Sequence, residues 1–508
     1  MRRVETDVVV IGSSFAGSLT ALILRRMGID VVLIDRQRHP RFAIGESSTP
    51  AADLVLADLC DRYDLPRLKP LAKYGTWRDT HPELRCGLKR GFSYFHHRPG
   101  EAFQQDADHS NELLVTASRS DEVGDTHWVR ADVDSFFTAE AVAAGAGLFE
   151  ETTIDSLEKS RGWQIGCRAG HRSMDVRCRF IIDSSGASSV LPAHFGFADR
   201  SQDFRTSSRA VFAHYHGIAR WKDRLVTEGG DVSDHPFDCD AAALHHIFDG
   251  AWMWILPFDG DLTSVGLVLD TQRHPELPGE PPISELARWL SRYPAVAAQF
   301  RRAEFAFPFD SLRRIGRMQR FRPVPTEWPV DDWTMLPGSM GVVDPFYSTG
   351  IAQSLLGVER VTRAFEDRDD KPRFGQRLRD HLATTESELH LIDQQVAAAY
   401  RTFGQNPQLL GAISMLYFAG TTTWEQRRAE QEASGDHALL LADDRAWRSI
   451  VDETVHDLSD VTANLPVSDT DTFRFAHRVE RRIAPYNRVG LFDLDAKNMY
   501  RYTAAPNT

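Results

Sequence analysis

The sequence has few cysteines, no long apolar run and an excess of acidic residues. Its five cysteines form no Cys-x-x-Cys pair and no metal-ligand spacing, which suits a reducing cytoplasm better than a disulfide framework. No apolar run is long enough to span a bilayer, and the first residues lack a signal-peptide core. The net charge of −13 argues against a nucleic-acid partner. We therefore expect a soluble, cytoplasmic protein that binds neither nucleic acid nor membrane.

The chain is too long for one compact domain. It has 508 residues, of which 42% are hydrophobic, so it can bury a large core and build more than one domain. It contains no internal repeat and no low-complexity tract. These properties fit a large cofactor-binding domain with additional segments.

The N-terminal segment has the pattern of a dinucleotide-binding unit. A β-branched run, Val8–Ile11, predicts a buried strand that Gly12 ends. Residues 18–27 predict a helix, and Val31–Ile34 predicts a second strand that ends at Asp35. The acid follows Gly12 by 23 residues (35 − 12), which is the spacing of a ribose-binding carboxylate.

Two glycines of the dinucleotide fingerprint are present and one is replaced. Gly12 allows the tight turn, Gly17 allows close packing of helix and strand, and Ser14 stands where the middle glycine belongs. The helix N-terminus would face a pyrophosphate. A plain strand–helix–strand unit without a ligand is the alternative interpretation.

Residues 41–50 form a polar loop with two interpretations. They could be a surface loop whose hydroxyl caps a helix over 51–60. They could instead be a cofactor loop, because an arginine and backbone N–H groups suit a pyrophosphate. Gly45-Glu-Ser-Ser-Thr-Pro50 after a dinucleotide-binding unit resembles the flavin-dependent halogenases, relatives of the aromatic hydroxylases. The resemblance implies FAD and an α/β fold with a Rossmann-like FAD domain of the glutathione-reductase type.

Further motifs fit the same resemblance. Arg130 with Asp134 resembles an arginine–acid signature that contacts FAD, although an exposed ion pair four residues apart is the simpler interpretation. Trp252-x-Trp254 resembles the tryptophan motif thought to keep substrate away from the flavin, although a bulky core strand is the usual meaning of such a pair. The acidic residue common before Asp344 in this fold is absent, because Ser339 occupies its place.

The resemblance implies a role for each matching residue. The FAD-binding residues would be Gly12, Ser14, Ala16, Gly17, Asp35, Arg36, Arg41, Gly45, Glu46, Ser47, Arg130, Asp183, Gly186, Asp344, Gly350 and Ile351. The halide would bind Ser348, Thr349 and Gly350, where amide groups open a helix. The passage to the substrate would be lined by Trp252, Trp254, Pro257 and Tyr347.

The resemblance also implies a catalytic lysine. Lys73 follows Glu46 by 27 residues (73 − 46) and precedes Tyr74-Gly75, as the family's lysine often does. A lysine can hydrogen-bond hypohalous acid, or attack it when neutral, and so direct the halogen onto one carbon. The competing interpretation is a lysine whose apolar stem lies on the protein while its amine reaches water.

The predicted activity is halogenation of an electron-rich aromatic compound, most simply a phenol. FADH2 from a separate reductase would react with O2 to give a flavin C4a-hydroperoxide, which chloride or bromide would convert to hypohalous acid. A flavin monooxygenase or other flavin oxidoreductase is the main alternative, followed by a halogenase of a carrier-tethered substrate and a non-catalytic flavin protein. The sequence leaves open whether the protein is a monomer or a homodimer.

The expected organisation has three parts. Residues 1–200 would form the FAD core, to which residues 330–370 return. Residues 201–330 alternate apolar and polar runs and would form an antiparallel sheet that holds substrate. Residues 371–508 would form a helical cap, with helices over 376–399, 407–418 and 422–433.

Four histidines could serve as metal ligands. His245 and His246 are adjacent, and His214 and His216 alternate, but neither pair has an acid or cysteine at ligand spacing. We therefore expect structural or substrate-contacting roles for these histidines and no metal.

Overall fold

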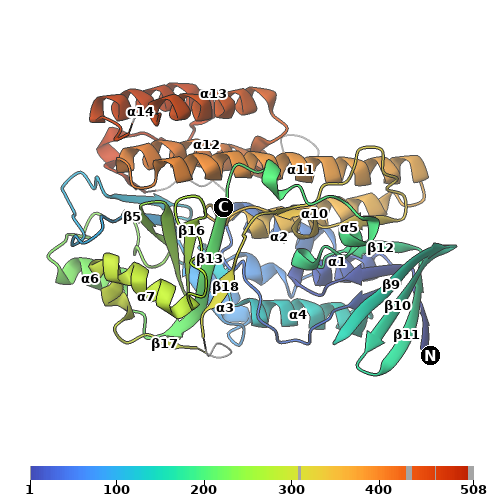
Figure 1. The fold of residues 1–508 in the computed structure, drawn as a ribbon. Helices are drawn as coiled ribbons and strands as arrows, with labels where there is room; N and C mark the ends of the chain where they lie inside the picture. Colours follow the sequence, from blue (N-terminus) through green and yellow to red (C-terminus); the bar gives the residue numbers. More distant parts are fainter. Residues whose placement is uncertain (1, 307–310, 431–436, 464, 502–508) are drawn as a thin grey trace.

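The computed structural model describes residues 2–306, 311–430, 437–463 and 465–501. A parallel sheet and its helices lie beside a large, mostly antiparallel sheet, and a group of long helices packs along both (Figure 1). This is the α/β architecture with a helical C-terminal part that the sequence predicts.

The FAD-type core is a five-stranded parallel sheet. Its strands, in spatial order, are β20 (Trp333–Met335), β12 (Phe180–Asp183), β2 (Val8–Ile11), β3 (Val31–Ile34) and β8 (Gly147–Phe149). The central strands are short and apolar because helices cover both faces. The helices α1 (Phe15–Arg26) and α4 (Arg130–Ala143) pack against each other on this sheet. A four-stranded sheet of β1 (Arg2–Glu5), β11 (Arg172–Cys178), β10 (Gly162–Ala169) and β9 (Thr152–Ser160) flanks the core.

The second large sheet has nine strands drawn from distant parts of the chain. They are β17 (Glu304–Phe305), β13 (Ser208–His216), β16 (Thr263–Asp270), β15 (Ala251–Pro257), β14 (Ala243–Phe248), β5 (Gly91–His96), β6 (Glu112–Thr116) and β22 (Met499–Tyr500), with β18 (Arg313–Ile315) on β13. β5 pairs in parallel with β14, so residues 91–116 belong to this sheet. A boundary at residue 200 therefore does not separate the two sheets, because paired strands cross it.

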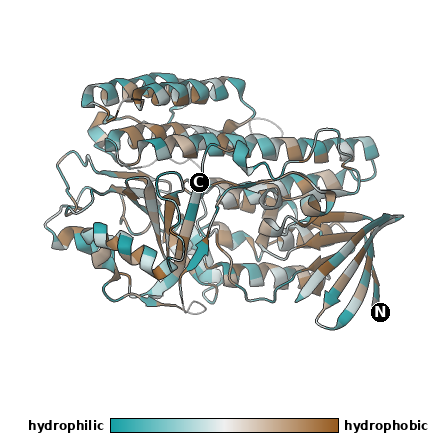
Figure 2. Ribbon diagram, viewed as in Figure 1, coloured by the Kyte–Doolittle hydropathy of each residue, from teal (hydrophilic) through white to brown (hydrophobic). Residues whose placement is uncertain are grey.

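Long helices cover the junction of the two sheets. They are α10 (Gly350–Glu366), α11 (Lys371–Thr402), α12 (Pro407–Ala429), α13 (Arg445–Val461) and α14 (Asp469–Ile483). α12 continues through the break expected after residue 418, and residues 431–433 of the third expected helix lie outside the described residues. Figure 2 shows brown, apolar residues on inward parts of these helices and on the strands beneath them.

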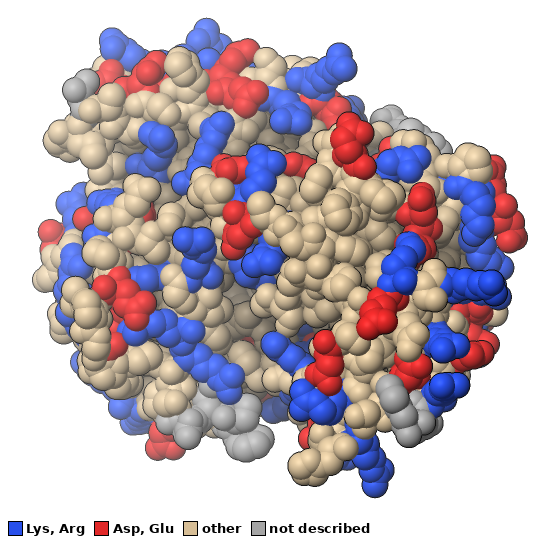
Figure 3. Space-filling view, turned by 45° about the vertical axis from the view of Figure 1, so that its right-hand side comes forward, with Lys and Arg blue, Asp and Glu red and all other residues tan. Residues whose placement is uncertain are grey.

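Shorter elements connect these layers. They are α2 (Pro50–Arg62), α3 (Tyr74–Thr80), α5 (Val190–Phe195), α6 (Trp221–Thr227), α7 (Pro282–Arg292), α8 (Pro294–Ala297), α9 (Pro337–Met340), β4 (Cys86–Lys89), β7 (Asp125–Trp128), β19 (Arg320–Phe321) and β21 (Gly341–Val342). In the described ranges, no helix combines the length and apolarity that crossing a membrane requires. On the face in Figure 3, acidic and basic side chains are interspersed and a hollow lies near the centre.

Candidate active site

The turn after β2 leaves no room for side chains at its two glycines. Gly12 has a φ of +98°, and a Cβ there would lie 2.4 Å from the Ser184 carbonyl oxygen. A Cβ on Gly17 would lie 2.1 Å from the Gly12 carbonyl oxygen. Ser14, the residue before α1, has a φ of −65°, so its position does not require glycine. The turn thus keeps the dinucleotide geometry despite the replaced glycine.

Asp35 lies at the carboxyl end of β3 beside this turn. Its Oδ2 accepts hydrogen bonds from the Ser13 amide and hydroxyl, each at 2.8 Å, and Arg41 Nη2 lies 3.5 Å away. Burial alone would raise the pKa of Asp35, but the Arg41 charge and the hydrogen bonds from Ser13 and Gln37 outweigh it, so the pKa is lowered. Asp35 is therefore an ionised acceptor, as a ribose contact requires.

Arg130 joins α4 to the loop around Gly45. Its guanidinium forms two hydrogen bonds with Asp134, at 2.9 and 3.1 Å, and Nη1 donates to the Ile44 and Gly45 carbonyls at 2.9 Å. Arg130 and Asp134 are both buried, so this is not the exposed ion pair of the simpler interpretation. It fixes the loop against the first turn of α1, where Phe15 N–H donates to Asp134.

A cavity of about 480 Å³ lies between the FAD-type core and the nine-stranded sheet. Eleven of the predicted site residues line it, namely Gly45, Glu46, Ser47, Arg130, Trp252, Trp254, Asp344, Ser348, Thr349, Gly350 and Ile351. The other predicted site residues do not line it, namely Gly12, Ser14, Ala16, Gly17, Asp35, Arg36, Arg41, Lys73, Asp183, Gly186, Pro257 and Tyr347. The cavity thus brings together residues from four separate motifs.

The amino end of α10 opens onto this cavity. Ser348 has a φ of +55°, and Ser348, Thr349 and Gly350 all line the cavity. The first amides of a helix have no acceptor within it, so they can bind an anion, and 17 residues of aligned peptide dipoles support this. The predicted halide residues therefore form one continuous surface.

Asp344 and Ser339 have different roles in the structure. Asp344 is buried and accepts hydrogen bonds from Ser208 Oγ at 2.6 Å and Tyr400 Oη at 2.7 Å. Burial raises the pKa of Asp344 to about 6. Ser339 Oγ donates to Asp183 Oδ1 at 3.0 Å and accepts from the Gly186 amide. Asp183 and Gly186 therefore shape the turn after β12. The Asp183 carboxylate and the Gly186 amide are both hydrogen-bonded to Ser339.

Several buried polar atoms around the cavity lack a hydrogen-bond partner among the described residues. They are Glu46 Oε2, Ser47 Oγ and Gln353 Nε2. A buried polar group without a partner is costly, which favours a polar ligand at these atoms. Together with the glycine turn and the ionised Asp35, they fit an FAD whose ring system lies in the cavity.

Trp252 and Trp254 lie on β15 and share a face of the sheet, as their spacing predicts. Their ring centroids are 5.9 Å apart. Trp252 Nε1 donates to Tyr400 at 3.0 Å and Trp254 Nε1 donates to Ser264 at 3.1 Å. The two indoles are thus held rigidly in one wall of the cavity.

Lys73 lies at the start of α3, outside this cavity. Its side chain is 24% exposed, and its Nζ is 3.8 Å from Asp53 Oδ2. Asp53 and Asp125 are fully buried next to each other, and burial raises the pKa of both carboxyls. Lys73 is therefore a half-buried cation at the edge of an acidic pair.

Lys89, which the sequence analysis did not single out, lies on the inner side of that acidic pair. It ends β4 opposite Asp125 of β7, and its ammonium donates to the Ser48 carbonyl. Its Nζ lies 4.2 Å from the centroid of the Phe92 ring. Burial lowers the pKa of Lys89 to about 8, and the Asp125, Asp53 and Glu425 carboxyls oppose that shift. A lysine with this pKa is about one tenth neutral at pH 7.

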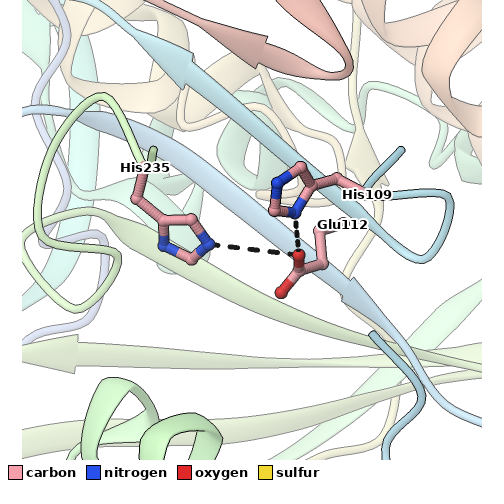
Figure 4. A group of neighbouring side chains, drawn as sticks. All are labelled: His109, Glu112 and His235. Carbon is pink, nitrogen blue, oxygen red and sulfur yellow. Dashed lines mark hydrogen bonds and ion pairs between the residues drawn. The ribbon is translucent and has the colours of Figure 1, made fainter. Parts of the chain in front are cut away.

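A second group of polar side chains lies away from the cavity (Figure 4). His109 Nδ1 pairs with Glu112 Oε2 at 2.5 Å, its Nε2 pairs with Asp234 at 2.9 Å, and His235 Nε2 is 4.0 Å from Glu112. Both ring nitrogens of His109 are used, and hydrogen bonding to Glu112 raises its pKa to about 9. The group is thus explained as a protonated histidine that neutralises a buried glutamate.

The turn, the ionised acid and the cavity fit an FAD-binding site of the glutathione-reductase type of fold. The FAD dependent oxidoreductase family (DAO) matches residues 7–251. Tetracycline 7-halogenase of Kitasatospora aureofaciens is 29% identical over 68% of this chain and 61% of its own length. Monodechloroaminopyrrolnitrin halogenase PrnC of Pseudomonas fluorescens is 27% identical over 84% of this chain and 73% of its own length.

The fold gives the same result. The crystal structure of the halogenase PltM in complex with phloroglucinol and FAD superposes with a TM-score of 0.85, at 22% identity, over 98% of this chain and 99% of that one. The chain is thus similar to flavin-dependent halogenases in sequence, and to a solved member of that group in fold. The segment aligned with tetracycline 7-halogenase spans less than two thirds of that relative.

Proposed function

We propose that the protein halogenates a small, electron-rich aromatic compound of the phenol class with chloride or bromide. Reduced FAD from a separate reductase, when bound, supplies the chemistry that turns O2 and halide into hypohalous acid. The relatives named above are halogenases of aromatic compounds, and PltM is described in complex with phloroglucinol, a phenol. The observation that carries the proposal is a buried lysine, Lys89, beside the wall of the flavin cavity.

Two lysines compete for the role of the amine that directs the halogen. Lys73, predicted from the sequence, is partly exposed. Lys89 is completely buried, so its amine is shielded from water that would carry the oxidant away. The Lys89 ammonium donates a hydrogen bond to the carbonyl of Ser48, which directly follows the cavity residues Glu46 and Ser47. These observations favour Lys89, and Lys73 remains the competing candidate.

The wall between Lys89 and the flavin cavity is thin. Phe92, beneath the Lys89 ammonium, stacks on His245 with ring centroids 6.0 Å apart, and His245 lines the flavin cavity. Two stacked rings, Phe92 and His245, therefore separate the Lys89 ammonium from the cavity, and a small oxidant would have to pass them. We propose that the tryptophan wall keeps the larger aromatic substrate away from the flavin, while Ser348, Thr349 and Gly350 hold the halide at the flavin.

The test compares Lys89→Ala and Lys89→Gln with Lys73→Ala. Each protein receives FADH2, O2, bromide and a panel of phenols, and mass spectrometry detects the products. We expect both Lys89 variants to lose halogenated phenol by ~10²-fold or more while FADH2 is still oxidised, and Lys73→Ala to change it by less than ~10-fold. FAD absorbance after gel filtration confirms that each variant is folded and loaded.

The other outcomes are equally informative. Loss of product in Lys73→Ala alone would move the role to Lys73. Hydroxylated phenol from the unmodified protein, formed without any halide, would replace the proposal with a flavin monooxygenase.

A further inference from the structure

Phe92, the ring beneath the Lys89 ammonium, also lines a second, smaller cavity. Its walls come from α2, β5, β6 and the helical cap. They are formed by Thr49, Pro50, Phe92, Val115, Ala117, Tyr417, Phe418, Thr421, Thr422 and Glu425. Its volume is about 20 Å³, which is room for one water-sized molecule. Apart from Glu425, the lining has no ionisable acid, and most of it is apolar or aromatic.

Glu425 is the polar exception in this lining. It lies on α12, is 2% exposed, and accepts a hydrogen bond from Thr421 Oγ1 at 3.2 Å. Burial and, to a smaller extent, the Asp125 charge raise the pKa of Glu425 to about 8, against the opposing effects of the Thr421 hydrogen bond and the Lys73 charge. At neutral pH Glu425 is thus mostly a neutral carboxylic acid, able to donate one proton.

Three charged side chains interact electrostatically with Glu425. They are Lys89 at the end of β4, Asp125 on β7 and Lys73 just before α3. Asp53 on α2 interacts in turn with Asp125 and Lys73. The Glu425 carboxyl also acts on the pKa of Lys89. Glu425 lines the small cavity, and the Lys89 ammonium lies over Phe92, another residue of its wall. One neutral acid and one weakly basic amine are therefore close to the same space, a pairing that favours proton transfer.

We propose that Glu425 is the acid–base residue of halogen transfer, acting on a phenol in this cavity and on hypohalous acid held at Lys89. This rests on the proposed function. As the ring attacks, a C–halogen bond forms and the O–halogen bond breaks. The departing hydroxide takes the Glu425 proton and leaves as water. The carboxylate then accepts the proton from the halogenated carbon, and the C–H electron pair restores the aromatic ring.

The step balances without any further reagent. Arene and hypohalous acid give haloarene and water, and Glu425 ends in its starting protonation state. The C-terminal helices would thus supply an acid–base residue as well as cover the cavity. A phenol ring needs more space than 20 Å³, so binding has to displace side chains of the α12 wall such as Phe418.

The test uses Glu425→Gln, which keeps the size and neutrality of the side chain and its hydrogen bond with Thr421. The matched control is Glu430→Gln on the exposed end of the same helix. We expect Glu425→Gln to lower kcat for phenol bromination by ~10²-fold or more, and Glu430→Gln to leave it unchanged. Ring-deuterated phenol should show a primary isotope effect in Glu425→Gln that is absent from the unmodified protein, because ring deprotonation becomes slow.

Bromination of a diffusible 1,3-dione, which traps hypobromous acid, distinguishes a failure of the Glu425 role from a failure of the proposed function. Glu425→Gln should still brominate the trap when phenol is left out. A full rate of phenol bromination in Glu425→Gln, or a reduced rate without an isotope effect, would overturn the role of Glu425. An unmodified protein that oxidises FADH2 without brominating either compound would overturn the proposed function itself.

Discussion

The rings of Tyr347 and Tyr417 stack face to face, with centroids 4.0 Å apart and planes at 6°. Tyr417 Oη also donates a hydrogen bond to the Tyr347 carbonyl at 3.0 Å. Tyr347 directly precedes Ser348, the residue with left-handed backbone geometry at the start of the predicted halide site. The helical cap therefore supports the loop that presents amides to the flavin cavity.

Removing this stack should weaken halide binding. Tyr417→Ala removes an aromatic pair of about 1 kcal/mol and leaves the loop before α10 less supported. We expect KM for bromide to rise several-fold, measured at saturating phenol and FADH2. Tyr417→Phe keeps the stack and loses only the hydrogen bond, so it should lie close to the unmodified protein. Equal bromide KM values in all three proteins would show that the cap does not support the halide loop.

A methyl group in the dinucleotide turn should expel the cofactor. In Gly17→Ala the new Cβ would lie 2.1 Å from the Gly12 carbonyl, so the turn has to open where the pyrophosphate is expected. We expect the purified Gly17→Ala variant to retain little FAD, as measured by absorbance. Addition of FAD should raise its melting temperature by less than it raises that of the unmodified protein. Gly411→Ala is the matched control, because it lies within α12 with open space around it and should stabilise that helix by up to about 1 kcal/mol. Full FAD content in Gly17→Ala would contradict the assignment of this turn.

The protein should lose stability at alkaline pH through His109. Hydrogen bonding to Glu112 raises the pKa of His109 from 6.5 to about 9. A raised histidine pKa stabilises the folded state fully below pH 6.5, and this contribution is lost as pH rises through about 9. We expect the free energy of unfolding, measured in urea, to fall by at most about 3 kcal/mol from this group over that range. The His109→Gln variant isolates the effect, since the difference between the two proteins should shrink with rising pH. A difference that stays constant from pH 6 to pH 9.5 would rule out a protonated His109.

Local patterns were sufficient to predict the strands and the turn from which the candidate flavin site is built. The strand, glycine turn and acid around Gly12 and Asp35 lie within one short segment, so their spacing carries the geometry. Trp252 and Trp254 share a face because strand residues two apart always do. Ser14 stands where the dinucleotide fingerprint has a glycine. Its φ of −65° is accessible to any residue, so the turn does not require glycine at this position.

Lys89, and Glu425 in the wall of the second cavity, could not be predicted in the same way. Lys89 ends a short strand and precedes Arg90, which is also the pattern of a solvated basic pair. The carboxyls that act on its ammonium, those of Asp53, Asp125 and Glu425, come from distant parts of the chain. Glu425 lies in a helix whose neighbours give no sign of a cavity. Such groups become visible only when long-range packing brings them together.

The parallel pairing of β5 with β14 limits how this protein can be engineered. One strand comes from before residue 100 and the other from after residue 240, with FAD-type elements between them in the chain. A chimera that exchanges residues 201–330 alone would bring in β14 of the donor protein without the β5 strand with which it pairs there. The recipient's own β5 would then have to pair with a β14 that it does not match. Transplanting substrate preference between relatives therefore requires both segments to move together.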